Sequence, residues 1–136
     1  MNILIVEARY HAHVADRLLD GATSALDQGM AQFTRVSVPG VLEVPGAIAL
    51  AARGPFHPAR GPFDAYVALG CVLGEDATAD TLYRESCRGL MQLGVLGNAI
   101  GNGVLLAADE AAALALAGNG DAGGDAARAA LALATL

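Results

Sequence analysis

The stretch from residue 66 to residue 90, YVALGCVLGEDATADTLYRESCRGL, holds side chains that could take part in chemistry. An apolar run ends at Cys71, an acidic segment with Glu75 and Asp76 follows, and a helical pattern comes next. Ligands of α/β proteins bind at such strand-to-helix turns, outside the carboxyl ends of parallel strands. The stretch has no His or Lys, and its first cation is Arg84. A site here would depend on backbone groups and carboxylates.

The composition of the chain excludes several other kinds of site. Because the chain contains no lysine, Schiff-base catalysis and a lysine-dependent phosphate loop are both excluded. The net charge of −6 argues against a nucleic-acid surface, which needs clustered cations. His11, His13 and His57 are not spaced as a metal-binding set, and we expect no metal. All eight cationic side chains are arginines, at positions 9, 17, 35, 53, 60, 84, 88 and 128.

Hydrophobic patterns predict a single domain, residues 1–136, in which strands and helices alternate. ILIVEA and FDAYVALGC are continuous apolar runs, typical of strands buried on both faces, while FTRVSVPG and NAIGNGVLLA predict two further strands. HVADRLLDGATSALDQGM predicts a helix that ends at Gly29 and has one apolar face, at Val14, Leu18, Ala22 and Leu26. The order of elements predicts a three-layer α/β fold, with a four-stranded parallel sheet between helices.

The remaining segments predict four more helices and two irregular regions. EVPGAIALAAR predicts a helix with Pro45 in its first turn, and TADTLYRESCRGLMQLGV one capped by Thr78 or Asp80. ADEAAALALAG predicts a helix that Gly118 ends, and DAARAALALATL predicts the last helix. The Pro- and Gly-rich residues 54–62 predict a surface loop, and GNGDAGG a flexible turn.

The sequence also bears on compartment and assembly. Cys71 and Cys87 suit reduced thiols of the cytoplasm better than a disulfide framework. We expect no membrane span, because no long uncharged apolar run occurs, and MNILIVEARY resembles a buried strand rather than a signal peptide. Ala-rich helix faces beyond the needs of the core favour a homo-oligomer.

Three segments should meet at one edge of the predicted sheet. EARY follows the first strand, VPGVLE the second and GCVLGED the third. Because the carboxyl ends of parallel strands share an edge, topology alone brings these segments together and predicts a small-molecule site there.

The same segments carry a family resemblance. ARYHAHVADRLLDGATSAL, VSVPGVLEVPGAIALA, FDAYVALGCVLGE, ESCRGLMQL and AIGNGVL, in this order, resemble the proteobacterial branch of the 6,7-dimethyl-8-ribityllumazine synthases. The resemblance implies a flavodoxin-like strand order and a step of riboflavin biosynthesis, in which 5-amino-6-(ribitylamino)uracil condenses with 3,4-dihydroxy-2-butanone 4-phosphate. It implies no cofactor and no metal. It also implies homopentamers or their multiples, with sites between subunits.

The resemblance assigns substrate-binding roles to particular residues. Tyr10 matches the aromatic that stacks on the pyrimidine, although a tyrosine at a strand end can equally cover the core edge. Val41, Leu42 and Glu43 match the segment that holds the ribityl chain, although Glu43 could instead serve only the start of a helix. Cys71, Val72 and Leu73 match the stretch whose backbone reads the uracil edge. Asn102 matches a position that the family contributes from the neighbouring subunit.

The chain departs from the family pattern where the phosphate and the catalytic histidine belong. The turn after GCV is one residue short, so Gly74, Glu75 and Asp76 occupy the phosphate-binding turn and Thr78 stands in the catalytic His position. The phosphate-binding arginine aligns with Leu116, and a following lysine aligns with Ala122.

These departures leave the function open between classes. A slow synthase is one interpretation, because lost acid–base catalysis costs roughly 10²- to 10⁴-fold and positioning of reactive substrates can compensate. A non-catalytic relative that binds lumazine or flavin, or that serves as an assembly subunit, is the second. An unrelated α/β nucleotide binder is the third.

Overall fold

The computed structural model describes residues 1–53 and 63–136, so the loop predicted at 54–62 lies outside the described residues. In the described part, strands and helices follow the predicted order, with a short 3-10 helix before the second α-helix. The strands are β1 (Asn2–Ala8), β2 (Gln32–Val38), β3 (Ala65–Leu73) and β4 (Ile100–Ala107). The helices are α1 (Ala12–Gln28), η1 (Val41–Glu43), α2 (Val44–Ala52), α3 (Ala77–Val95), α4 (Glu110–Ala117) and α5 (Ala122–Ala134).

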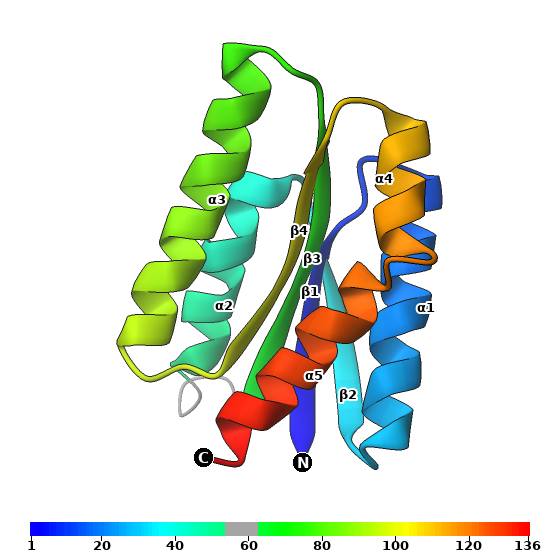
Figure 1. Ribbon diagram of the computed structural model, residues 1–136. Coiled ribbons are helices and arrows are strands. Elements are labelled where there is room, and N and C mark those ends of the chain that lie inside the picture. The colour runs from blue at the N-terminus through cyan, green and yellow to red at the C-terminus, as the bar shows by residue number, and fades with distance from the viewer. Residues whose placement is uncertain (54–62) are drawn as a thin grey trace.

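The strands form one parallel sheet with the order β2-β1-β3-β4. Helices α2 and α3 cover one face, and α1, α4 and α5 cover the other (Figure 1). This confirms the predicted three-layer α/β fold and its flavodoxin-like order. Both chain termini lie at the edge where β1 begins, opposite the carboxyl ends of the strands (Figure 1).

The two central strands are buried on both faces. Along β1, Ile3 and Ile5 pack with α1 and α5, while Leu4 and Val6 pack with α2 and α3. In β3 every residue but the last is buried. Burying an aliphatic side chain of this size contributes ~1.5–3 kcal/mol, so these runs hold the three layers together. Their continuous apolar character is what the sequence patterns predicted.

Helix α1 has the predicted amphipathic face. Its Val14, Leu18, Ala22 and Leu26 side chains are 0% exposed, and the helix ends at Gly29. The predicted first-turn position of Pro45 in α2 and the end of α4 at Gly118 are also confirmed.

The cap of α3 differs from the prediction. The carboxylate of Asp76, rather than Thr78 or Asp80, accepts a hydrogen bond from the Ala79 backbone N–H at 2.9 Å. Gly74, with a φ of 136°, turns the chain sharply out of β3. Because this turn is so short, α3 starts directly after Asp76, and the two residues predicted as caps lie inside its first turn.

The start of α5 also differs. The predicted flexible turn includes residues that form the first turn of this helix, among them the buried Gly123 and Gly124. A Cβ atom on Gly123 would lie 2.0 Å from the Leu18 carbonyl oxygen of α1. Glycine has low helix propensity, which favoured a turn, but here its small size allows α5 to pack directly on the α1 backbone.

No described helix combines the length and apolar character that a membrane crossing requires.

The packing of α5 on α1 predicts opposite effects for two glycine-to-alanine substitutions in helices. We expect Gly123→Ala to lower the free energy of unfolding by ~2 kcal/mol, because the methyl group overlaps the Leu18 carbonyl. We expect Gly94→Ala in α3 to be neutral or stabilising by up to ~1 kcal/mol, because no described atom beyond its chain neighbours and the surrounding helix backbone lies within 4 Å of the new methyl. Urea unfolding measures both, and equal shifts would contradict the close α1–α5 packing.

Candidate functional site

A pocket of about 460 Å³ lies at the carboxyl ends of β1, β2 and β3. The end of β1, the turn through η1, the end of β3 and Leu82 of α3 supply its walls. Topology therefore brought the three predicted segments together. The predicted site residues that line this pocket are Tyr10, Val41, Leu42, Glu43, Cys71, Val72 and Leu73.

Tyr10 lies beyond the end of β1 and is 82% exposed. Its ring contacts His11 edge to face, with centroids 5.0 Å apart. This exposure rules out the alternative in which the ring covers the core edge. The ring is therefore available for a flat ligand, since aromatic rings gain from offset stacking.

Glu43 ends η1 and is exposed at the pocket. It occupies the N-cap of α2, yet its side chain makes no capping hydrogen bond. A favourable interaction with the helix dipole remains. Both carboxylate oxygens are consequently open to ligand hydroxyl groups.

Strand β3 extends past the end of its pairing with β1. The last β1–β3 pair is Glu7 with Leu69, whereas β4 stays paired as far as Leu73 with Ala107. Residues 70–73 are therefore paired with a strand on one side only. Because each residue has a backbone donor and acceptor, this free edge can bond a polar ligand.

Cys71 packs at this edge and is only 8% exposed. Burial raises the pKa of its thiol from 9.0 to about 11. The thiol is therefore neutral at pH 7, and since the thiolate is the nucleophilic form, Cys71 serves as a packing residue rather than a nucleophile.

The other predicted site residues of α3 and its preceding turn lie in separate hollows. Glu75 and Asp76 line a hollow of about 340 Å³ together with Asp80. Thr78 lines a smaller hollow of about 260 Å³ with Leu82, which also lines the main pocket. The structure thus places the acidic turn and Thr78 beside the pocket, not within its walls.

Asn102 and Leu116 lie outside these hollows. Asn102 is exposed on the edge strand β4, where its amide nitrogen donates to the Cys87 sulfur at 3.3 Å. Leu116 is 45% exposed on α4, across the sheet from α3. Ala122, aligned with the missing lysine, begins α5.

A buried carboxylate near the end of β1 was missed by the sequence analysis. Glu7 is 1% exposed and accepts hydrogen bonds from Arg9 at 2.7 Å and Arg35 at 2.8 Å. Arg9 also pairs with Asp16 of α1, and the hydrogen bond to Glu7 is the main cause of its raised pKa. The cluster fixes the chain between β1 and α1, and it engages Arg9, which lies between the pocket-lining residues Ala8 and Tyr10. A charged residue inside the apolar run ILIVEA was its only sequence signal.

Ser86 was also missed. Its side chain is 0% exposed and lies behind the η1 turn of the pocket. The signal for it was a lone hydroxyl in the apolar row that Leu82 and Leu90 form at helical spacing.

Among the described residues, no group of three or more His, Cys, Asp or Glu side chains is arranged to hold a metal ion.

Comparison with known proteins gives consistent matches. The sequence model of the 6,7-dimethyl-8-ribityllumazine synthase family matches residues 1–136. A protein named 6,7-dimethyl-8-ribityllumazine synthase from Sphingopyxis alaskensis is 51% identical, covering 99% of this chain and 94% of the relative. One from Novosphingobium aromaticivorans is 46% identical, covering 98% and 94%. From Rhizobium meliloti, 6,7-dimethyl-8-ribityllumazine synthase 1 is 46% identical, covering 100% and 91%.

The raised pKa of Cys71 predicts a loss of stability in alkali. The unfolded chain releases the thiol proton near pH 9 and the folded chain near pH 11, so between these values the unfolded state binds fewer protons. We expect the free energy of unfolding to fall across this window, and to fall less in Cys71→Ala. Urea unfolding at pH 8, 9, 10 and 11 measures the slopes, and parallel slopes would contradict the buried neutral thiol.

Proposed function

Since this chain belongs to the 6,7-dimethyl-8-ribityllumazine synthase family, we propose that its strand-end pocket carries out the reaction of that family. The reaction condenses 5-amino-6-(ribitylamino)uracil with 3,4-dihydroxy-2-butanone 4-phosphate, a step of riboflavin biosynthesis. The observation that carries the proposal is that one pocket of about 460 Å³ gathers seven of the predicted substrate-binding residues. The proposal requires no cofactor or metal.

The pyrimidine half binds between Tyr10 and the free edge of β3. The exposed Tyr10 ring supplies the stacking face. Unpaired backbone groups of residues 71–73 exchange hydrogen bonds with the uracil edge. Tyr10 and these groups lie in one pocket, which supports a flat polar heterocycle as ligand.

The ribityl chain binds along η1. The Glu43 carboxylate accepts hydrogen bonds from its hydroxyl groups, and Val41 and Leu42 contribute backbone groups and apolar contact. A charged acceptor strengthens such bonds, typically to ~1.5–3 kcal/mol each. This contact orients the substrate amines toward the first turn of α3, where Thr78 lies.

The butanone phosphate binds beside α3, at the turn with Glu75 and Asp76. Each carboxylate repels a nearby phosphate charge by ~1 kcal/mol at 4 Å even at the dielectric constant of water. Asp80, which lines this hollow, forms an ion pair of 2.9 Å with Arg84. The first amides of α3 attract anions. Phosphate binding is therefore weak.

Thr78 occupies the acid–base position in this proposal. A threonine hydroxyl is a poor acid and base near pH 7, so a contribution of roughly 10²- to 10⁴-fold is lost. Positioning of two reactive substrates then supplies most of the rate, and turnover is slow. The synthase names of the relatives favour this reading over a non-catalytic lumazine- or flavin-binding relative.

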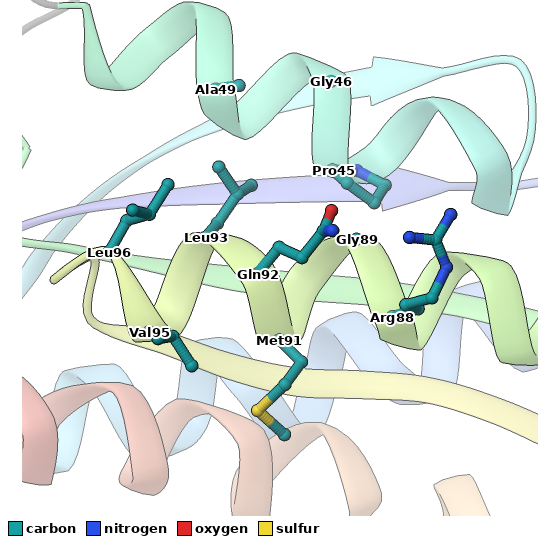
Figure 2. A pocket seen from close by; sticks show the side chains of 10 residues that line it. All are labelled: Pro45, Gly46, Ala49, Arg88, Gly89, Met91, Gln92, Leu93, Val95 and Leu96. Atoms are coloured by element: carbon teal, nitrogen blue, oxygen red, sulfur yellow. The ribbon is translucent and has the colours of Figure 1, made fainter.

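The chain assembles as a homo-oligomer, a pentamer or its multiples, in the cytoplasm. An apolar groove of about 760 Å³ lies between α2 and α3, where Leu93 and Leu96 point toward α2 (Figure 2). Met91, Val95 and Leu96 at this groove are 68%, 79% and 80% exposed. A second copy that covers these side chains would remove a large apolar surface from water. In this assembly Asn102, the position that the family resemblance places at the subunit boundary, completes the pocket of a neighbouring subunit. The two free cysteines support a reducing compartment.

Glu43 provides the test of the reaction. We expect purified protein to form fluorescent lumazine from the two substrates. In Glu43→Ala the KM for the ribityl pyrimidine should rise roughly 10- to 100-fold, because hydrogen bonds to a charged group are lost. Glu43→Gln, which keeps an acceptor, should show a smaller rise.

Glu75→Ala is the matched control for Glu43→Ala. It removes a carboxylate from the neighbouring hollow, so it should leave the KM for the pyrimidine unchanged and lower the KM for the phosphate substrate. No product from the wild-type protein, or equal effects of the two alanine variants, would contradict the proposed site.

The assembly is tested at Val95. We expect the wild-type protein to sediment as a multiple of its 13.7 kDa mass. Val95→Asp should sediment as a smaller species, because it places a charge on a surface that a second copy would otherwise bury. Met30→Asp, at an 89% exposed residue outside the groove, should keep the wild-type assembly. A monomeric wild-type protein in analytical ultracentrifugation would contradict this interface.

A further inference from the structure

Helix α3 contacts the substrate-binding turn through Ser86. Among the described residues, only Ser86 and Glu7 are buried polar or charged side chains. The Ser86 hydroxyl donates a hydrogen bond of 2.7 Å to the Val41 carbonyl, 45 residues earlier in the chain. Buried hydroxyl groups need such a partner, and here that partner belongs to the pocket wall.

The Val41 carbonyl lacks one partner that a helix would normally give it. It accepts the Val44 backbone N–H, which closes the 3-10 turn. Its α-helical partner would be the N–H of residue 45, four positions later, but Pro45 has none. A carbonyl oxygen accepts two hydrogen bonds, and the Ser86 hydroxyl takes the place of the missing amide.

The rest of the turn is packed as closely as this hydrogen bond suggests. A Cβ atom on Gly70 of β3 would lie 2.8 Å from Val41, and one on Gly89 of α3 would lie 2.9 Å from Pro45. Val41 is therefore held from β3 on one side and from α3 on the other. Its neighbours Leu42 and Glu43 are exposed and line the pocket.

We propose that Ser86 is a positioning residue. Its hydroxyl holds the Val41 carbonyl in place of the backbone N–H that Pro45 lacks, and it thereby orients Glu43 toward the ribityl chain. This role rests on the proposed function of the pocket. Ser86 does not touch the substrate, so it acts only through the turn. Without the Ser86 hydroxyl, the Val41 carbonyl keeps only the hydrogen bond from the Val44 N–H, so η1 can change its orientation. The Glu43 carboxylate then spends less time in its binding position.

A double-mutant cycle tests this role against a merely structural one. We expect Ser86→Ala to raise the KM for the ribityl pyrimidine roughly 3- to 10-fold, with kcat and the KM for the phosphate substrate nearly unchanged. In a Glu43→Ala background, Ser86→Ala should add less than a further 2-fold, because the two residues act as a unit. Equal effects in both backgrounds would overturn the proposal.

Pro45→Ala supplies the rescue. It restores an N–H that can bond the Val41 carbonyl. Ser86→Ala combined with Pro45→Ala should therefore recover most of the lost affinity for the ribityl pyrimidine, even if Ser86→Ala lowers the melting temperature and the double variant does not restore it. Failure of the double variant to recover affinity would overturn the proposal. Ser24→Ala, which removes an exposed hydroxyl from α1, is the control and should change neither KM.

Riboflavin binding, followed by quenching of its fluorescence, separates this proposal from the proposed function. If the wild-type protein forms no lumazine but binds riboflavin, and Ser86→Ala weakens binding only when Glu43 is present, the proposed reaction fails and the role of Ser86 stands. If the wild-type protein forms lumazine and Ser86→Ala leaves KM unchanged, the reaction stands and the role of Ser86 fails. Absence of both product and binding overturns both.

Discussion

The incomplete pairing of β3 is the constraint on which the site depends. Inside the sheet, β1 and β3 are covered by helices on both faces, so polar groups of a ligand have no access to them. Beyond Leu69, β3 continues along β4 while β1 has already turned away. Since a free backbone edge needs hydrogen-bond partners, the pocket forms where the sheet stops being complete. The Tyr10 and Glu43 side chains that line the pocket come from the turns that follow β1 and β2.

Small residues let the layers approach closely enough to shape this pocket. Gly70 admits Val41, and Gly89 admits Pro45, so the η1 turn lies against both β3 and α3. On the other face, Gly123 lies against the α1 backbone. The high alanine and glycine content thus has a structural effect, because larger side chains at these contacts would push the helices away from the sheet.

The patterns that predicted the fold are local, whereas the missed features depend on distant parts of the chain. The apolar face of α1 and the buried runs of β1 and β3 follow from periodicity, and the meeting of Tyr10, Glu43 and Cys71 follows from strand topology. Periodicity indicates that Ser86 is buried, but it does not reveal that its hydrogen-bond partner is Val41, 45 residues away. The helix at Gly123 forms because of contact with α1, which overrides propensity. Likewise, sequence adjacency does not reveal that Thr78 and the acidic turn occupy hollows separate from the main pocket.

The two chain termini share the edge of the sheet where β1 begins, opposite the carboxyl ends of the strands (Figure 1). The pocket lies at those carboxyl ends. Leu136 is fully solvent-accessible and Met1 is 46% exposed, so neither end is held by the core. A fluorophore, affinity tag or fused domain joined to either end therefore projects away from the pocket. The scaffold can therefore carry cargo at both ends of a single polypeptide, at the edge of the sheet opposite the pocket.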